Sequence, residues 1–566
     1  MFHTQWKCAN AFPCKTAKRW GRAAIGLGVF TFIVELLFAL SLQQLAVSSG
    51  LVSDDPSGGI FLDGKQSVTV AAVIFISVAF LRLCLTWLNG VAVGIMQVTF
   101  EAEMRKNISR WSLLSPGVST GTVATLFNDV VVCSAAAFSS IYFFVGRIVM
   151  IIFTFCVLAY HSPTITVISL CAVVLCIPAQ RFLDVRIRQA SEQIRQSLAS
   201  VTEGLMRSVK NSYFIRIHGL AETEGKEQDW LITQFEQSSK KYHIFSSARG
   251  IVPQLIGVIV ITLVMVGVAN QSEISAGFTI AYIYLVMRFF QAISDASRVT
   301  ANINGNWPRM RELRDWHESE SLRSGAEEKI ITRPERYSIR EPVGFRLSDV
   351  SFKWDIEPII SGISVKINAG EMVILTGPSG CGKTTLLMIM CNILKATSGS
   401  IDIIHNGSEY NIDELGDSLT EGMAYVGPDP FIIEGTVRAY LNYGSATSYN
   451  QEEIFTTLKK CNCGFIFALD KGLDHYITEQ GGGLSAGQMQ RLSLARAMLK
   501  QPKLLLLDEA TSNLDNVSEQ KIVDALKSLK GTMTILFATH RIAISKIADT
   551  TIDLGLSSEN MTKNDA

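Results

Sequence analysis

Long apolar runs in the first 300 residues constrain this chain more than any other feature of its sequence. A helix needs roughly 20 apolar residues to cross a bilayer, and six segments meet or approach that length. Together with a mean hydropathy of +0.26 and a charged share of only 18%, they exclude a disordered or fibrous chain and predict a multi-pass membrane protein. The predicted spans are residues 23–47, 67–100, 130–160, 163–183, 250–269 and 276–300.

The charges between these segments predict the orientation of the chain. Residues 1–22 and 184–249 are rich in Lys and Arg, whereas residues 48–66 carry mainly Asp. By the positive-inside rule, both termini lie in the cytoplasm, and we expect a plasma membrane, the inner one in bacteria, as the host. The first apolar run, of about 25 residues, exceeds the 7–15 of a signal peptide, so we expect a retained span.

Some helices are predicted to project beyond the membrane. Residues 67–100 would form a helix about 51 Å long at 1.5 Å per residue, whereas the hydrocarbon core is about 30 Å thick. The polar residues 184–249 keep a helical pattern without a turn cluster rich in Pro and Gly. We therefore expect them to continue the fourth and fifth spans into water.

A change of composition after residue 320 predicts a second domain. The expected organisation is an all-α six-helix transmembrane domain over residues 1–320, a charged linker over 321–342, and an α/β domain over 343–566. In the last part, a short apolar run ends in Gly377-Pro-Ser-Gly-Cys-Gly-Lys383-Thr384-Thr385, a complete GxxxxGK[ST] pattern that opens an apolar helix. A strand before this pattern and a helix after it are the context that a phosphate-binding P-loop needs.

The P-loop predicts a site for ATP and Mg²⁺. Its glycines let consecutive backbone N–H groups point at phosphate oxygens, at a helix N-terminus that adds partial positive charge. We expect Lys383 to reach the β- and γ-phosphates and Thr384 to bind Mg²⁺. The other predicted nucleotide-binding residues of the loop are Gly377, Ser379, Gly380, Cys381, Gly382 and Thr385.

An acidic pair downstream predicts the rest of the catalytic site. Four leucines, residues 504–507, suit a strand buried on both faces and lead directly into Asp508 and Glu509. Ligands bind at the carboxyl ends of parallel strands. We therefore expect Asp508 to hold Mg²⁺ and Glu509 to act as the base for the attacking water. The 51 basic and 51 acidic residues cancel, so the global basic field of a nucleic-acid binder is missing.

Further motifs make the chain resemble the ATPases of ABC transporters. They are Leu484-Ser485-Ala486-Gly487-Gln488, then Ser512-Asn513-Leu514-Asp515, then Ala538-Thr539-His540-Arg541, in that order after the P-loop. The resemblance implies that Ser485, Gly487 and Gln488 bind the γ-phosphate of ATP held by another subunit, and that Asp515 also belongs to the nucleotide site. It further implies that His540 contacts the γ-phosphate and that Trp354 stacks on adenine, with Phe352 as the alternative aromatic.

The chain departs from the family pattern at one loop. The family usually shows Tyr-Val-Pro-Gln-Asp-Pro-Phe, whereas this chain has Tyr425-Val426-Gly427-Pro428-Asp429-Pro430-Phe431. Pro428 stands where the family's Gln senses Mg²⁺ and the attacking water, and proline has neither a side-chain amide nor a backbone N–H. Asp429 is the candidate to replace it.

The membrane half is similar to that of exporter-type half-transporters. Ser119-Thr120-Gly121, followed by Phe127-Asn128-Asp129, is similar to the exporter motif before the third span. Six spans and one ATPase per chain imply a homodimer with two composite ATP sites. Coupling helices that touch the ATPase are expected near residues 112–122 and 208–219.

Charged residues within the predicted spans are the candidates for cargo binding, because charge inside a membrane is expensive. They are Glu35, Arg82, Arg147 and Arg288. Three arginines suit an anionic, amphiphilic cargo, and the placement of three of the four residues resembles the flippases of lipid-linked oligosaccharides. Peptides, small amphiphiles and other lipids remain alternatives, and Glu35 paired with Arg82 or Arg147 can also be a structural bridge. An ATP-gated channel or regulator, favoured by Pro428, is the alternative to an exporter.

Overall fold

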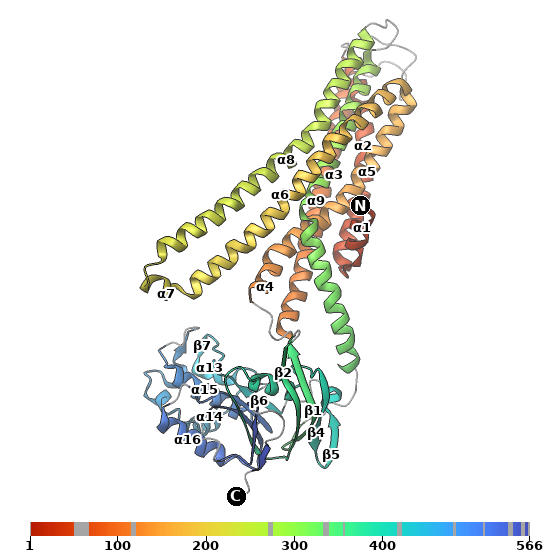
Figure 1. Cartoon of the computed structure of the whole chain (residues 1–566). Helices are drawn as coiled ribbons and strands as arrows, with labels where there is room; N and C mark the ends of the chain where they lie inside the picture. The colour runs from red at the N-terminus through yellow and green to blue at the C-terminus, as the bar shows by residue number, and fades with distance from the viewer. Residues whose placement is uncertain are drawn as a thin grey trace. The chain divides into compact units, whose positions relative to one another are not determined.

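The chain forms two compact units, Met1–Leu322 and Arg323–Ala566, which are shown in Figure 1 and described separately. The first is mostly helical and the second is an α/β domain, which confirms the predicted fold class. The computed structural model describes residues 2–49, 67–114, 120–269, 276–331, 339–354, 357–415, 422–445, 447–478, 483–512, 515–540, 547–555 and 561–563.

The membrane unit is built from long helices that follow the predicted apolar segments. Among the described residues, five of them (α2, α3, α5, α6 and α8) are long and apolar enough to cross a membrane. The elements are α1 (Phe2–Ala11), α2 (Lys15–Ser48), α3 (Val68–Leu114), α4 (Thr120–Thr125), the π-helix η1 (Leu126–Val130), α5 (Val131–His161), α6 (Pro163–Lys210), α7 (Ser212–Ile217), α8 (Ala221–Ala269) and α9 (Ala276–Ile331).

The sixth predicted span is the beginning of α9. Arg288, Asp295 and Arg298 interrupt its apolar pattern. The side chains of residues 276–281 lie outside the described part of the structure. The helix then continues to Ile331, well into the predicted linker. It can do so because the two prolines of that segment, Pro334 and Pro342, come only later in the chain.

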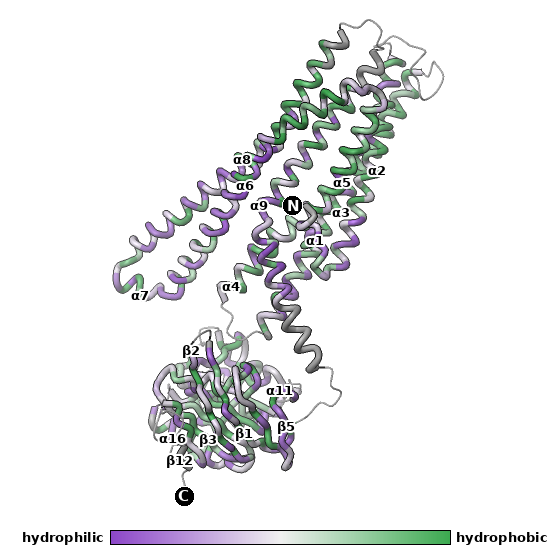
Figure 2. The backbone as a smooth tube through the Cα atoms, turned by 45° about the vertical axis from the view of Figure 1, so that its right-hand side comes forward, coloured by the Kyte–Doolittle hydropathy of each residue, from purple (hydrophilic) through white to green (hydrophobic). Residues whose placement is uncertain are grey.

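Helices α6 and α8 form a long hairpin with the short helix α7 at its tip (Figure 1). Figure 2 shows apolar residues concentrated in the half of the hairpin away from α7 and polar residues in the half next to it. The polar residues 184–249 thus extend two apolar helices, as their helical pattern predicts. An ion pair between Asp184 and Arg249, 2.9 Å from Oδ1 to Nε, ties α6 to α8 where the character of the hairpin changes.

The second unit is organised around a largely parallel six-stranded sheet in the order β12-β11-β3-β10-β9-β6, in which only β12 is antiparallel to its neighbour. A four-stranded antiparallel sheet, β2-β1-β4-β5, and a two-stranded one, β7-β8, complete it. The strands are β1 (Gly344–Trp354), β2 (Glu357–Ile367), β3 (Met372–Thr376), β4 (Ser398–His405), β5 (Ser408–Asn411), β6 (Met423–Val426), β7 (Gly435–Thr436), β8 (Tyr476–Ile477), β9 (Leu504–Asp508), β10 (Thr534–Ala538), β11 (Thr550–Asp553) and β12 (Met561–Lys563).

The helices of this unit include the two that open at the predicted motifs, α10 after the P-loop and α15 after Ser485. The helices among the described residues are α10 (Lys383–Met390), α11 (Ile412–Leu415), α13 (Val437–Asn442), α14 (Gln451–Lys460), the 3₁₀ helices η2 (Gly464–Ala468) and η3 (Gly472–Asp474), α15 (Ala486–Leu499) and α16 (Asn516–Lys527).

The central strands are apolar throughout because both faces of the sheet are covered. Residues alternate between two hydrophobic cores: Leu505 and Leu507 of β9 face one, and Leu504 and Leu506 face the other. All five residues of β9 are buried. The run of leucines is therefore a central strand, which delivers Asp508 to the carboxyl edge of the sheet.

Candidate functional site

The P-loop spans the turn between β3 and α10 and is shaped by its glycines. Gly377, Gly380 and Gly382 have φ of 139°, 84° and 98°, a region that side chains disfavour. A Cβ at Gly382 would come within 2.8 Å of the side chain of Ile359. The loop can therefore adopt this path only with glycine at these positions.

Lys383 lies across the loop that it follows. Its side chain is buried, and Nζ donates to the carbonyl oxygens of Gly377 and Pro378 at 2.9 Å each. The ammonium group is thus already held inside the loop, where the sequence predicts that it meets phosphate. Ser379 and Thr384 are exposed at the mouth of the loop, and Cys381 and Thr385 are partly buried.

Asp508 lies at the same edge of the sheet as the P-loop, because β3, β10 and β9 are parallel neighbours. Its side chain is nearly inaccessible, with 2% exposure. Burial raises its pKa, and hydrogen bonds from Thr384 and Tyr425 oppose the rise. A carboxylate and a hydroxyl in contact supply the hard oxygen ligands that Mg²⁺ prefers, so Asp508 and Thr384 fit the predicted metal.

Glu509 and His540 meet at the ends of β9 and β10. The His540 Nδ1 atom is 3.7 Å from Glu509 Oε1, and both side chains reach solvent. Glu509 has a φ of 49°, an uncommon conformation for a residue other than glycine, and its N–H donates to the carbonyl of Ala538 at 2.9 Å. The turn therefore aims the carboxylate away from the sheet and toward solvent, as a group that activates water requires.

The motif Leu484–Gln488, which we call the signature, leads into the N-terminus of helix α15. Ser485 caps α15 reciprocally with Gln488: its Oγ accepts from the Gln488 N–H at 3.2 Å, and its own N–H donates to Gln488 Oε1 at 2.7 Å. Gly487 follows in the first turn. This cap orders a set of backbone N–H groups at a position where an anion is stabilised.

Asp515 has a defined structural role in this chain. It caps α16 by accepting from the Ser518 N–H at 2.9 Å, and this hydrogen bond holds the pKa of Asp515 below its usual range. Of the aromatic candidates for adenine stacking, Phe352 is buried in a hydrophobic core, so its ring cannot face a ligand. The side chain of Trp354 lies outside the described residues.

Two contacts of this site involve residues that sequence reasoning missed. The buried Gln490 of α15 donates from Nε2 to the carbonyl of Glu509 at 3.1 Å, which connects the signature helix to the predicted base. Tyr425 of β6 donates from Oη to Asp508 Oδ2 at 3.4 Å. The first contact depends on how α15 packs near the end of β9, and the second on β6 lying beside β9. A linear motif does not report either arrangement.

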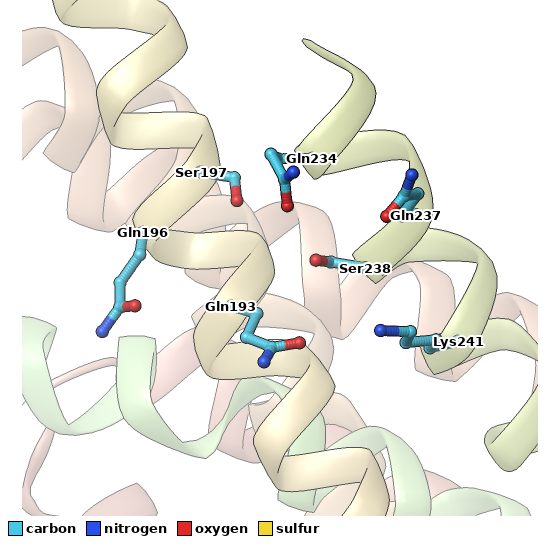
Figure 3. Close-up of a pocket in the computed structure, with 7 residues that line it drawn as sticks. All are labelled: Gln193, Gln196, Ser197, Gln234, Gln237, Ser238 and Lys241. Carbon is cyan, nitrogen blue, oxygen red and sulfur yellow. The ribbon is translucent and has the colours of Figure 1, made fainter. Parts of the chain in front are cut away.

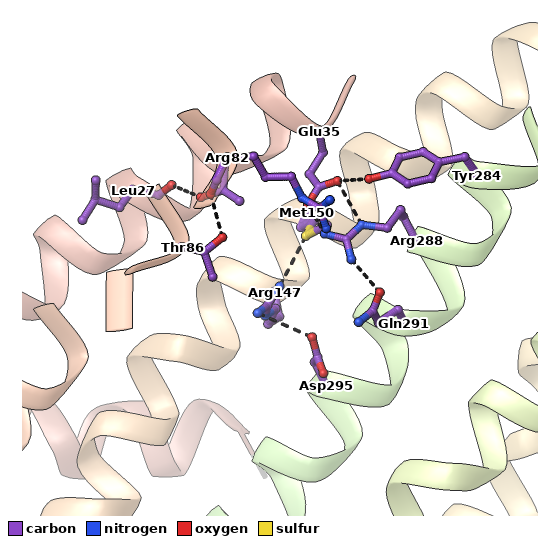
Figure 4. Close-up of polar contacts among 11 residues, drawn as sticks. Leu27, Glu35, Arg82, Thr86, Arg147, Met150, Tyr284, Arg288, Gln291 and Asp295 are labelled. Atoms are coloured by element: carbon purple, nitrogen blue, oxygen red, sulfur yellow. Dashed lines mark hydrogen bonds and ion pairs between the residues drawn. The ribbon is translucent and has the colours of Figure 1, made fainter. Parts of the chain in front are cut away.

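In the membrane unit, four helices bring together the charged residues predicted for cargo (Figure 4). Glu35 of α2 is 4% exposed and binds Arg82 of α3 at 2.8 Å and Arg288 of α9. Tyr284 donates to Glu35 Oε2 at 2.5 Å. Arg147 of α5 pairs instead with Asp295, at 3.4 Å.

We call Glu35, Arg82, Arg147, Arg288 and Asp295 the ion cluster. It holds three guanidinium groups and two carboxylates, so it carries one net positive charge. Asp295 is the member that sequence reasoning did not select, although it lies two helical turns after Arg288 and on the same helix. Each arginine remains 17–26% exposed and Asp295 is 25% exposed, whereas Glu35 is only 4% exposed, so the accessible part of the cluster is three guanidinium groups and one carboxylate.

Other polar contacts of the membrane unit were not predicted. Arg309 of α9, 5% exposed, binds Asp129 of the π-helix at 2.8 Å. A polar cavity of about 170 Å³ lies between α6 and α8. Figure 3 shows the amide, hydroxyl and ammonium side chains that line it. Gln193 and Gln196, and likewise Gln234 and Gln237, are three residues apart, a helical spacing that could have signalled it. The lining residues are Gln193, Gln196, Ser197, Gln234, Gln237, Ser238 and Lys241.

Known proteins share both halves of this arrangement. The family model described as ABC transporter matches residues 360–512, and the model described as ABC transporter transmembrane region matches residues 23–293. The structure of a bacterial Atm1-family ABC exporter with ATP bound has the same fold, with a TM-score of 0.74 and 19% identity over 95% of this chain and 93% of that one.

Curated relatives cover most of the chain at modest identity. The ATP-dependent lipid A-core flippase of Escherichia coli (strain K12) is 27% identical over 491 residues, 85% of this chain and 82% of that protein. The flippase of the same name from Vibrio vulnificus (strain YJ016) is 25% identical over 471 residues, 82% of this chain and 79% of that protein. ABC transporter B family member 29, chloroplastic, of Arabidopsis thaliana is 26% identical over 442 residues, 75% of this chain and 67% of that protein.

Proposed function

Because this chain belongs to the ABC transporter family as an exporter-type half-transporter, an integral membrane protein that binds ATP and couples its hydrolysis to translocation, we propose a specific cargo and assembly for it. Two copies form a homodimer that moves an amphiphilic, anionic cargo out of the cytoplasm or the cytoplasmic leaflet. The ion cluster carries this proposal: it places three partly exposed guanidinium groups among apolar helices.

The contacts of the described residues support roles in the ATP site for this function. The P-loop N–H groups and Lys383, whose Nζ lies inside the loop, would hold the phosphates. Glu509 would accept a proton from the attacking water, and His540, 3.7 Å from it, would contact the γ-phosphate. Mg²⁺ held by Thr384 and Asp508 would neutralise charge on the transferred phosphoryl group. The capped N-terminus of α15 is the group that a second copy presents, since one chain has one P-loop and one signature.

The anionic headgroup of the cargo would bind the arginines that now contact Glu35 and Asp295. Guanidinium groups recognise phosphate and carboxylate through paired N–H donors, and in the ion cluster they are already oriented by Glu35 and Asp295. An anionic headgroup that enters this region meets partly exposed guanidinium donors, while its apolar part stays among the spanning helices. The positive-inside distribution of Lys and Arg supports cytoplasmic termini for this transporter.

Stimulation of ATPase activity by cargo tests this function. The protein, reconstituted in neutral lipid, is supplied with anionic lipid, glycolipid or peptide fractions and with matched neutral ones. We expect anionic amphiphiles to raise turnover several-fold, and Arg82→Gln or Arg288→Gln to remove that response. Arg186→Gln, an exposed arginine outside the ion cluster, is the matched control. Equal stimulation by neutral and anionic fractions would refute the anionic cargo.

An ATP-gated channel or regulator is the second candidate, and Pro428 is the observation that favours it. A gate needs ATP binding to change conformation but does not need turnover in proportion to cargo. Ion conductance that depends on ATP, measured in the same vesicles without cargo-stimulated hydrolysis, would support the gate. Hydrolysis that rises with cargo, without conductance, would support the exporter.

A further inference from the structure

The loop after β6 leaves the Mg²⁺ site without the glutamine that the family usually places there. Pro428 has no amide, and its side chain and that of Asp429 are both exposed. A residue that takes over must bring a polar atom to the buried carboxylate of Asp508. The two described side chains that hydrogen-bond to it are Thr384, which belongs to the P-loop, and Tyr425.

Tyr425 reaches Asp508 because of strand register. It pairs with Leu506 of β9, two residues before Asp508, so its side chain lies beside the end of that strand. Its Oη donates to Asp508 Oδ2 at 3.4 Å, although 41% of the residue is exposed. One edge of the tyrosine therefore faces solvent while its hydroxyl lies against the carboxylate.

Gly427 provides the space for this contact. A Cβ at residue 427 would come 2.9 Å from Tyr425 Oη, 3.0 Å from Cε1 and 3.2 Å from Cζ. These distances are shorter than ordinary van der Waals contact, so a side chain here would displace the ring. The usual family pattern has proline at this position and glutamine at the next. This chain has glycine and then proline, so the same two changes that remove the amide also make room for the tyrosine.

We propose that Tyr425 is a positioning residue for the divalent cation of the ATP site. Its hydroxyl fixes the rotation of the Asp508 carboxylate, which would otherwise turn broadly about its last bond. The carboxylate, held beside Thr384, would then present its oxygens to a bound divalent cation in one orientation. The inference rests on the proposed Mg²⁺-dependent ATPase function, and it assigns to Tyr425 part of the role that Pro428 cannot fill.

Metal affinity measured apart from turnover tests this role. The full-length protein is loaded with a non-hydrolysable ATP analogue and titrated with Mn²⁺, whose free concentration is followed by electron paramagnetic resonance. Residues that orient metal ligands typically contribute 10–100-fold to metal affinity. We expect Tyr425→Phe to weaken Mn²⁺ binding about tenfold, while binding of the analogue in EDTA stays at the wild-type value.

Three further variants make the test specific. Gly427→Ala should weaken Mn²⁺ binding as Tyr425→Phe does, because the new methyl group displaces the ring without touching the metal. Tyr443→Phe, an exposed tyrosine of the same domain, should change nothing. Adding Pro428→Gln to Tyr425→Phe should recover Mn²⁺ affinity, since it restores an amide at the family's position.

Each outcome separates this inference from the proposed function. Wild-type Mn²⁺ affinity in Tyr425→Phe would overturn the role of Tyr425 and leave the ATPase proposal intact. Loss of analogue binding in EDTA would also overturn it, because the tyrosine would then support the fold of the nucleotide site in general. A wild-type protein that binds the analogue but no Mn²⁺ would refute the proposed metal-dependent function itself.

Discussion

The two units place their important side chains by opposite means. In the nucleotide unit, Lys383 contacts carbonyl oxygens five and six residues before it, and a few glycines set the geometry. In the membrane unit, Glu35 contacts partners 47 and 253 residues away, on separate helices. The P-loop is formed almost entirely by a local turn, whereas the ion cluster exists only when whole helices assemble. Substitutions in the P-loop should therefore alter mainly chemistry, whereas substitutions in the ion cluster should also affect how the helices assemble.

The largest effect is expected at the predicted base. Glu509→Gln removes the proton acceptor and keeps the size of the side chain, so general-base catalysis worth about 10²–10⁴-fold in turnover should be lost. ATP binding should survive, and an ATP-bound closed dimer should accumulate. Lys383→Ala is the contrast, because it should weaken ATP binding itself. Measurements of turnover and of nucleotide binding on both variants test these two roles. Near-normal turnover in Glu509→Gln would show that Glu509 is not the base.

The next prediction concerns assembly of the membrane unit. Glu35→Gln leaves Arg82 and Arg288 without their shared carboxylate, and breaking a buried ion pair costs about 3–5 kcal/mol. Thermal unfolding of the detergent-solubilised protein should shift strongly to lower temperature. Glu192→Gln removes a carboxylate from a more exposed pair with Arg195 and should cost at most about 1 kcal/mol. Equal shifts in the two variants would contradict a structural role for the ion cluster.

A third prediction asks whether the nucleotide unit is complete within one copy. Ser485→Arg and Lys383→Ala should each inactivate a homodimer. If the signature acts on the P-loop of the other copy, a mixed dimer of the two variants keeps one intact site, and random mixing should restore roughly a quarter of wild-type turnover. Tagged subunits verify mixing, and no recovery in verified mixed dimers would argue against action between copies.

The smallest effect is expected at Pro428. Pro428→Gln should raise basal ATPase activity several-fold, because a contact to a charged group contributes about 1.5–3 kcal/mol and the loss of proline stiffness costs only about 0.4–1 kcal/mol. Steady-state ATP turnover of the folded, dimeric variant, compared with that of the wild type, measures this change in activity. An unchanged or lower rate would mean that other groups, Asp429 or Tyr425, already fill the role.

The sequence predicted the parts of the molecule that depend on short stretches of chain. The P-loop turn, the buried strand before Asp508 and the long apolar helices all follow from residues within one element. The pairing of Tyr425 with Asp508 escaped prediction because it depends on β6 lying beside β9 in one register. The ion cluster was half predicted: the charges inside apolar segments were evident, but which carboxylate binds which arginine depends on helix packing.

The separation of 253 residues between Glu35 and Arg288 has a consequence for biogenesis. At about 5–20 residues per second, translation takes roughly 13–50 s to produce Arg288 after Glu35 has emerged. During that interval Arg82 is the partner already made, so the first two spans can enter the bilayer as a neutral pair. Arg288 arrives with the last apolar segment, and its binding to Glu35 joins the final helix to the first. The ion cluster can thus form completely only after the last span has been inserted into the membrane.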